Sequence, residues 1–63
     1  MDGEAVAVVD LEEGMEIEYK TAHGGRAVGI VEAQWRVGGY VRTQLCDGVV
    51  LTHAPFRSIV VLS

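Results

Sequence analysis

The feature that most constrains this chain of 63 residues is the alternation of short apolar runs with glycine-containing breaks. The runs are rich in valine and isoleucine, which favour β-strands over helices. No stretch of the sequence repeats the apolar spacing of an amphipathic helix. The breaks fall at five places: Gly14, Gly24–Gly25, Gly38–Gly39, Asp47–Gly48 and Ala54–Pro55. This pattern predicts an all-β fold of short antiparallel strands in a single domain that covers residues 1–63.

Six segments of the sequence have the composition or the alternation of strands. Residues 15–21 alternate between apolar and charged side chains, which is the period of a strand with one face in water. Residues 26–37 form the longest run, and Gly29 within it predicts a bulge or a bend. The other four candidate strands cover residues 4–9, 40–46, 49–53 and 59–62.

The breaks also predict how the strands are connected. Gly38–Gly39 and Asp47–Gly48 are two-residue connections typical of β-hairpins. Pro55 has no backbone N–H to donate to a ladder. Residues 54–58 are therefore expected to interrupt the sheet with one turn of 3-10 helix.

In this order of elements the chain resembles the SH3-like small barrels, including the KOW and Tudor modules. The resemblance rests on five segments: residues 13–19, 26–31, 38–42, 47–51 and 56–62. It implies a barrel of five or six antiparallel strands over residues 12–62, with residues 1–11 as an N-terminal arm or an extra strand. Members of this class bind RNA, DNA, ribosomal partners, proline-rich peptides or methylated side chains, so the resemblance implies a fold and not one function. This chain lacks an aromatic cage and has few basic residues in its loops.

Charge is distributed unevenly along the chain, whose formal net charge is −4. Residues 1–18 carry seven acidic side chains and no basic one, whereas residues 19–63 carry five basic side chains and two acidic ones. The overall acidity argues against attraction of the whole surface to nucleic acid, although a local basic patch stays open. An acidic surface with one lysine also resembles the small acidic proteins of salt-loving archaea. The alternative is an ordinary acidic protein from a GC-rich genome.

The short length limits the size of the core. A domain of about 60 residues buries only about 60% of the surface of its unfolded chain, and such domains often need a disulfide, a metal or a partner subunit. Cys46 is the only cysteine, so no intramolecular disulfide forms, and no cysteine–histidine cluster has the spacing of a zinc site. We therefore expect a homodimer. No apolar run has the length of a membrane span, the first residues lack the basic region of a signal peptide, and a lone thiol fits a reducing compartment, so a cytoplasmic protein is expected.

The two predicted hairpins give the sheet a second apolar face. A two-residue turn in the second hairpin sets Leu45 opposite Val50, and one in the first sets Val37 opposite Tyr40. Both faces are then partly apolar, while a barrel of this size has one interior. The candidate interface consists of four residues on one face: Val31, Val37, Val49 and Leu51. An exposed apolar face is typical of an interaction surface, so the leading hypothesis is a non-enzymatic protein-interaction or assembly module.

Two aromatic and two arginine side chains flank the tip of the first hairpin: Trp35, Arg36, Tyr40 and Arg42. Aromatic rings stack on bases and arginines neutralise phosphates, so an RNA- or single-stranded DNA-binding module is the alternative hypothesis. Tryptophan and tyrosine are also typical of a core or a dimer interface, which is the favoured interpretation.

No set of residues has the pattern of an active site, and neither an enzyme activity nor a cofactor is expected. Cys46 is expected to be a buried small hydrophobe and not a nucleophile. Cys46, His23 and His53 are too widely spaced in the sequence to indicate a metal site. The glycines at 24–29 precede a strand and not a helix, so they do not predict a phosphate-binding loop. The glutamates of the N-terminal segment are expected to be solvated, with none set apart for acid–base chemistry.

Overall fold

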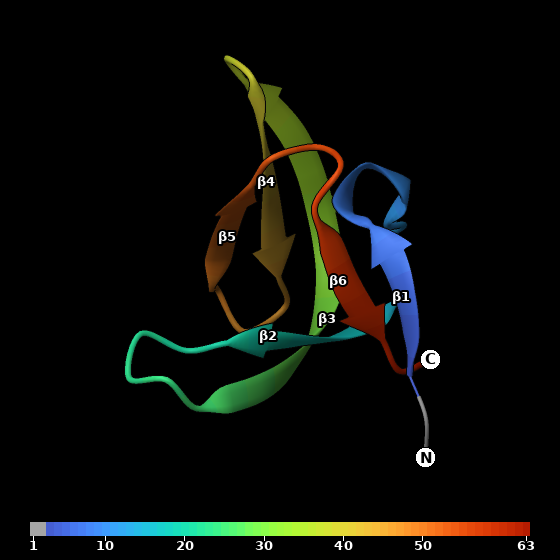
Figure 1. Cartoon of the computed structure of the whole chain (residues 1–63), viewed down its shortest axis with the longest axis vertical. Helices are drawn as coiled ribbons and strands as arrows, with labels where there is room; N and C mark the ends of the chain where they lie inside the picture. The colour runs from blue at the N-terminus through green and yellow to red at the C-terminus, as the bar shows by residue number, and fades with distance from the viewer. Residues whose placement is uncertain (1–2) are drawn as a thin grey trace.

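Six antiparallel strands form one sheet in the computed structural model, which describes residues 3–63 (Figure 1). The strands are β1 (Glu4–Ala7), β2 (Glu16–Lys20), β3 (Arg26–Val37), β4 (Tyr40–Leu45), β5 (Val50–His53) and β6 (Ser58–Val61), in the order β1-β6-β2-β3-β4-β5. The predicted all-β fold of antiparallel strands is therefore confirmed. β1 and β5 lie at the two ends of this order, and within residues 3–63 no ladder joins them. No helix in this part of the chain has the length and apolarity needed to cross a bilayer.

β3 is the strand that joins the two halves of the sheet. Its N-terminal half pairs with β2, and its C-terminal half pairs with β4. The register shifts between Val31 and Ala33, so the irregularity lies there and not at Gly29, the position that the sequence predicts. Gly29 has another role, because a Cβ atom at this position would lie 2.7 Å from Leu45 Cδ1. The missing side chain lets the core leucine pack directly on the β3 backbone.

The connection between β3 and β4 is the two-residue turn that the sequence predicts. Gly38 and Gly39 form it, and Val37 pairs with Tyr40 on either side. Of the two glycines only Gly38 has a positive φ, at 60°, which is the arrangement of a type II′ turn. This turn matches the twist of the flanking strands and fixes their register.

The connection between β4 and β5 is one residue longer than the sequence predicts. The Leu45 N–H donates to the Val49 carbonyl at 2.8 Å, and the Gly48 N–H donates to the Leu45 carbonyl at 2.9 Å. The loop therefore has three residues, and the last of them, Gly48, takes a φ of 93°. The extra residue shifts the register by one. As a result Gln44 takes the place opposite Val50 that the two-residue turn predicts for Leu45.

Seven buried apolar side chains make up the core inside the curved sheet. They come from four strands and the N-terminal segment: Val8, Leu11, Ile17, Val31, Val41, Leu45 and Ile59. Residues 3–11 thus contribute both β1 and two core side chains. The 3-10 helix lies here, as η1 (Val8–Asp10), and not near Pro55. At that position the Arg57 N–H donates to the Ala54 carbonyl at 3.1 Å in a single turn.

A buried polar link ties η1 to the sheet. Gln34 Nε2 donates to the Val8 carbonyl at 2.9 Å and to Thr43 Oγ1 at 3.0 Å. Thr43 is 1% exposed and lies among the core side chains. The Gln34 amide therefore satisfies two acceptors that are shielded from water.

Candidate functional site

The four residues of the predicted aromatic and arginine patch do not lie on one face of the β3–β4 hairpin. Trp35 pairs with Arg42, and Arg36 pairs with the core residue Val41. Trp35, Tyr40 and Arg42 share one face, because side chains alternate along a strand. Arg36 lies on the other face. The structure thus brings three of the four residues together.

The face that carries Trp35 is turned away from the core and is extended by β5. Its exposed large apolar side chains are Trp35 (39% exposed), Val37 (48%), Tyr40 (56%) and Val50 (44%). We call this surface the outer face of β3–β5. Its charged groups are Arg42 and Glu32, and the Glu32 carboxylate accepts a hydrogen bond from Gln44 Nε2 at 2.9 Å. The outer face of β3–β5 thus carries four exposed large apolar side chains, one cation and one anion, and the polar residues Gln44 and Thr52 lie between Val50 and the other three apolar residues.

The residues of the predicted interface fall on different sides of the sheet. Val31 is 2% exposed and belongs to the core, so it is not available to a partner. Val49 and Leu51 are half-buried and pack against the core, which leaves Val37 as the one of the four on the outer face. Two one-residue shifts explain the difference: the irregularity after Val31 and the three-residue loop before Val49. Each exchanges the faces of the residues that follow it.

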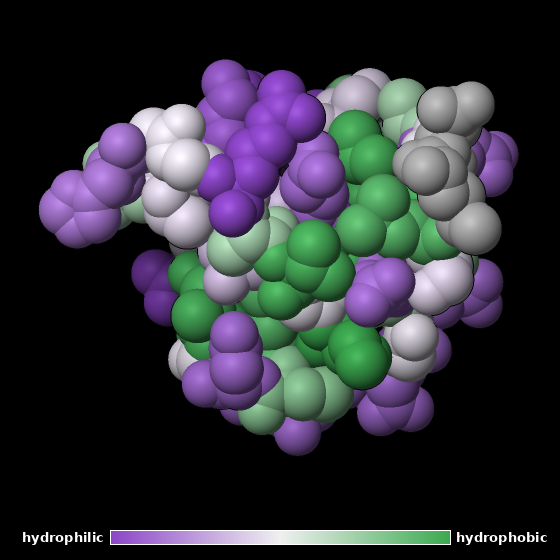
Figure 2. Space-filling model, turned by 90° about the horizontal axis from the view of Figure 1, so that it is seen from below, coloured by the Kyte–Doolittle hydropathy of each residue, from purple (hydrophilic) through white to green (hydrophobic). Residues whose placement is uncertain are grey.

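A second apolar area lies on the outer side of β2 and β3. Val28 and Ile30 are both about half exposed there, and they line a shallow hollow of about 260 Å³ together with Cys46 and Asp47. Figure 2 shows apolar surface gathered on this side of the molecule among hydrophilic groups. Cys46 is exposed, contrary to the prediction of a buried thiol. The reason is that the three-residue loop takes it out of the β4–β5 ladder.

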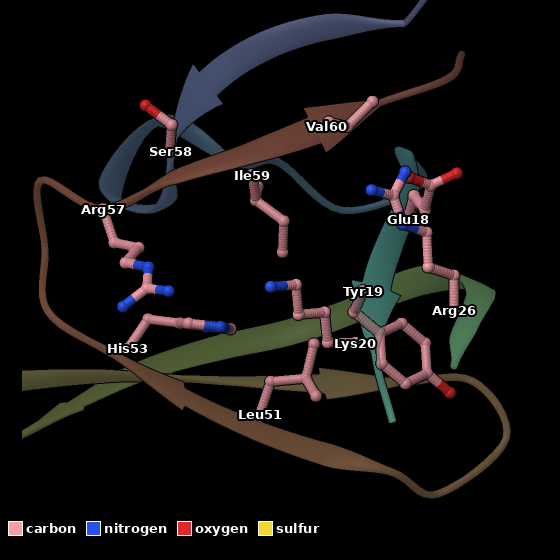
Figure 3. Close-up of a pocket in the computed structure, with 10 residues that line it drawn as sticks. All are labelled: Glu18, Tyr19, Lys20, Arg26, Leu51, His53, Arg57, Ser58, Ile59 and Val60. Carbon is pink, nitrogen blue, oxygen red and sulfur yellow. The ribbon is translucent and has the colours of Figure 1, made fainter. Parts of the chain in front are cut away.

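A cleft of about 220 Å³ lies between the end of β2, β5 and β6 (Figure 3). We call it the cationic cleft. Its lining consists of ten residues: Glu18, Tyr19, Lys20, Arg26, Leu51, His53, Arg57, Ser58, Ile59 and Val60. Figure 3 shows the Lys20 ammonium group pointing into this space and the Arg57 guanidinium group beside the His53 ring. Arg26 Nη1 contacts Glu18 Oε1 at 2.9 Å, so the acidic side chain of the lining is already paired.

The His53 side chain is half-buried at the end of β5. Its Nδ1 atom is buried and has no hydrogen-bond partner within residues 3–63. Burial of the ring, and to a smaller extent the positive charge of Arg57, lowers the pKa of His53 below its ordinary value of 6.5. His53 is therefore mainly uncharged at neutral pH.

The lowered pKa of His53 is expected to make stability depend on pH. In the unfolded chain His53 gains a proton as the pH falls through 6.5, whereas in the folded protein it resists protonation until a lower pH. The unfolded state binds more protons in this range, so the free energy of unfolding is expected to decrease as the pH drops below 6.5. Denaturant titrations at a series of pH values measure the slope.

Two histidine variants test whether His53 causes this pH dependence of the free energy of unfolding. His53→Gln is expected to flatten it, because the titrating group is gone. His23→Gln removes an exposed histidine of the β2–β3 loop and is expected to leave the slope unchanged. A slope that persists in His53→Gln would assign the pH dependence to a different group.

The described residues contain no group of three or more histidine, cysteine, aspartate or glutamate side chains placed to hold a metal ion. Cys46 lies in the loop before β5, His53 ends β5, and His23 lies in the β2–β3 loop. The three residues considered as metal ligands from the sequence are thus on separate parts of the sheet.

The cationic cleft is the feature that the sequence analysis misses. Lys20, His53 and Arg57 come from three separate segments, and no spacing motif links them. They meet because β6 pairs with β2, while the turn at Ala54–Arg57 connects β6 to β5. Only the strand order brings the three side chains to one place.

Comparisons with known proteins identify no relative of this chain. No protein-family model, no curated protein sequence and no solved structure matches it. The resemblance to SH3-like barrels therefore stays a prediction, and the function has to be argued from the surfaces described above.

Proposed function

We propose that this protein is a small, non-enzymatic assembly module that forms a homodimer through the outer face of β3–β5. The observation that carries the proposal is the group of four exposed apolar side chains on that face, contributed by three neighbouring strands. Exposed apolar side chains gathered on one face of a small protein are typical of an interaction site. Tryptophan and tyrosine, here Trp35 and Tyr40, are frequent anchors of such sites.

A second copy of the chain is the partner that best fits the charges of this face. Arg42 and Glu32 supply one positive and one negative group. In a two-fold symmetric dimer the same patch occurs on both sides of the interface. Each charge of one copy then has an opposite charge available on the facing patch, and no charge has to be buried alone.

The size of the core also favours a partner subunit. Seven apolar side chains form the buried core of the described residues. The single cysteine excludes an intramolecular disulfide as an additional source of stability. A domain this small has a low free energy of unfolding, because it buries a smaller fraction of its surface than a larger domain does. Covering the outer face of β3–β5 removes further apolar surface from water without lengthening the chain.

Sedimentation equilibrium at low and at molar salt tests the proposal. We expect the wild-type protein to be a dimer at micromolar concentration. Val50→Asp places a carboxylate within the interface and is expected to weaken dimerisation by at least about tenfold, because an unpaired buried charge costs more than about 1.4 kcal/mol.

Val28→Asp is the matched control for this experiment. Val28 is 49% exposed and Val50 is 44% exposed, but Val28 lies on the outer side of β2 and β3. The control variant is expected to dimerise as the wild type does. A monomeric wild-type protein, or equal dissociation of the two variants, would contradict the proposal.

Single-stranded nucleic acid is a second candidate partner, favoured by the position of Trp35, Tyr40 and Arg42 on one face. Stacking on an aromatic ring contributes about 1–3 kcal/mol per base. One arginine offers few phosphate contacts, however, and Arg36 lies on the other side of the hairpin, so we rank this function second. Titration of short RNA and DNA oligomers, followed by the emission and anisotropy of Trp35, distinguishes the two. If the oligomers change the Trp35 signal saturably and Arg42→Glu abolishes this change, nucleic-acid binding would replace homodimerisation as the proposed function.

We also propose that the protein works in the cytoplasm of an organism that lives at high salt. Cys46 is exposed, and a reducing compartment keeps such a thiol out of disulfides. The acidic side chains of the first 18 residues repel one another less in molar salt, where the Debye length is about 3 Å. Molar salt is therefore the condition in which we expect the dimer to be most stable.

A further inference from the structure

We propose that the cationic cleft binds a small organic anion, a carboxylate carried on an apolar group. The cleft is separate from the outer face of β3–β5, because Leu51 and His53 alternate with Val50 along β5 and point to the opposite side of the strand. The proposal therefore does not rest on the homodimer. The Val50→Asp variant is expected to bind the ligand as the wild type does, so the two proposals fail or succeed independently.

The charge balance of the cleft is positive in a chain whose net charge is −4. Three cationic side chains and one carboxylate line it. The carboxylate, Glu18, is paired with Arg26 at 2.9 Å, and this is the one salt bridge found in residues 3–63. Lys20 and Arg57 are left without an acidic partner in that part of the chain, and both reach the same space (Figure 3). An anion in the cleft supplies the opposite charge to both.

His53 adds a directional group to these two charges. Its buried Nδ1 atom has no hydrogen-bond partner among the described residues, and buried polar atoms are rarely left in that state. The His53 ring lines the cleft, and both of its nitrogens are donors when it is protonated, so a carboxylate in the cleft accepts a hydrogen bond from the nitrogen that faces it. The negative charge also stabilises the protonated ring, which opposes the effect of Arg57.

The remaining walls of the cleft favour an apolar group attached to the anion. Tyr19, Leu51 and Ile59 line the same space, and Figure 3 shows Ile59 and Leu51 on opposite sides of it. An inorganic anion leaves these walls uncovered, whereas a short alkyl or aryl group removes them from water. The volume of about 220 Å³ is below the about 300–1,000 Å³ of sites for drug-sized ligands. The ligand is therefore limited to a few carbon atoms beyond the carboxylate.

Two sources supply this chemistry. One is a free short-chain carboxylic acid, for which butyrate is the probe. The other is the C-terminal carboxylate of a peptide that ends in an apolar residue, for which N-acetyl-alanyl-leucine is the probe. Binding of either supports the site, and the tighter of the two identifies the source.

Histidine NMR of the intact chain provides the readout, because the protein contains two histidines. His53 lines the cleft, and His23, in the exposed β2–β3 loop, is an internal reference. We expect a saturable shift of the His53 ring signals and a rise in the pKa of His53 on adding either probe. The His23 signals are expected to stay unchanged. Butyramide, the neutral analogue of butyrate, is expected to bind about fivefold more weakly or worse.

Charge-removing variants separate a specific site from general attraction of anions. Lys20→Gln and Arg57→Gln are each expected to weaken butyrate binding about fivefold, the modest effect of one ion pair at a partly exposed site. Arg36→Gln removes an exposed arginine outside the cleft and is expected to leave the affinity unchanged. All three positions are exposed, so the variants are expected to fold. The proposal is overturned by equal affinity for phosphate and butyrate, by equal effects of the three variants, or by the absence of a saturable His53 shift.

Discussion

Replacing Leu45 with alanine is expected to leave much of the protein unfolded under conditions in which the wild type folds. Leu45 is fully buried and packs on the β3 backbone at Gly29. Truncating a buried leucine to alanine costs about 2–5 kcal/mol. A folded chain of this length has about 3–9 kcal/mol of stability in total, so the loss is of comparable size. Urea titration followed by far-ultraviolet circular dichroism measures it.

Two further variants test the physical basis of this effect. Val28→Ala is the matched control, since Val28 is 49% exposed and lies outside the proposed dimer interface, and a change within about 0.5 kcal/mol is expected. Gly29→Ala is expected to destabilise the wild type, because the new methyl group meets Leu45 Cδ1. In the Leu45→Ala background the same methyl group enters vacated space and is expected to cost less. Additive effects of Gly29→Ala and Leu45→Ala would mean that the two residues do not pack on each other.

Replacing Gln34 with leucine is expected to lower the free energy of unfolding by about 1–3 kcal/mol. The Gln34 amide donates to the Val8 carbonyl and to Thr43 Oγ1, and both acceptors belong to buried residues. Leucine occupies a similar volume but leaves these two oxygen atoms without the donor. The Val8 carbonyl keeps the Leu11 N–H as a donor at 3.2 Å, so the penalty comes mainly from the buried Thr43 hydroxyl and not from a cavity.

Gln44→Leu is the matched control for the Gln34 variant. Gln44 Nε2 donates to Glu32 on the outer face of β3–β5, so a change within about 0.5 kcal/mol is expected at protein concentrations low enough for the monomer to dominate. Hydrogen exchange locates the effect, because the amides of Val8 and Leu11 are hydrogen-bonded in and around η1. These amides are expected to exchange faster in Gln34→Leu. Equal destabilisation by the two glutamine variants would show that the buried link contributes no more than the exposed one.

The strands follow from the sequence because their signals are local. The alternation over residues 15–21 predicts β2, and the long apolar run predicts β3 with its bounds at residues 26 and 37. The Gly38–Gly39 turn is predictable as well, because glycine accepts the positive φ that a type II′ turn needs. Each of these predictions depends on neighbouring residues alone.

The assignment of side chains to faces does not follow in the same way, because it depends on register. Val31 is predicted at the interface and lies in the core, and Cys46 is predicted in the core and lies at the surface. A single additional residue in a loop or bulge reverses every side chain beyond it. Gly48 is compatible with a two-residue or a three-residue loop, so composition does not choose between them.

The cationic cleft requires knowledge of the strand order. Lys20 and Arg57 are far apart in the sequence, and they line one space because β2 and β6 are neighbours in the sheet. His53 joins them from β5, which reaches the cleft without pairing to either strand. The sequence shows that Lys20, His53 and Arg57 are present, but only the order of the strands shows that they line one cleft.

The pairing of β1 with β6 has a consequence for how the chain is made. β1 leaves the ribosome before the other five strands, whereas β6, the strand that completes its hydrogen bonds, leaves after them (Figure 1). Val6 pairs with Ile59, and the Val8 N–H donates to the Arg57 carbonyl, so neither interaction can form before β6 is available. The apolar side chains of β1 therefore stay uncovered until β6 is translated, and the β1–β6 ladder forms only once residue 61 has emerged.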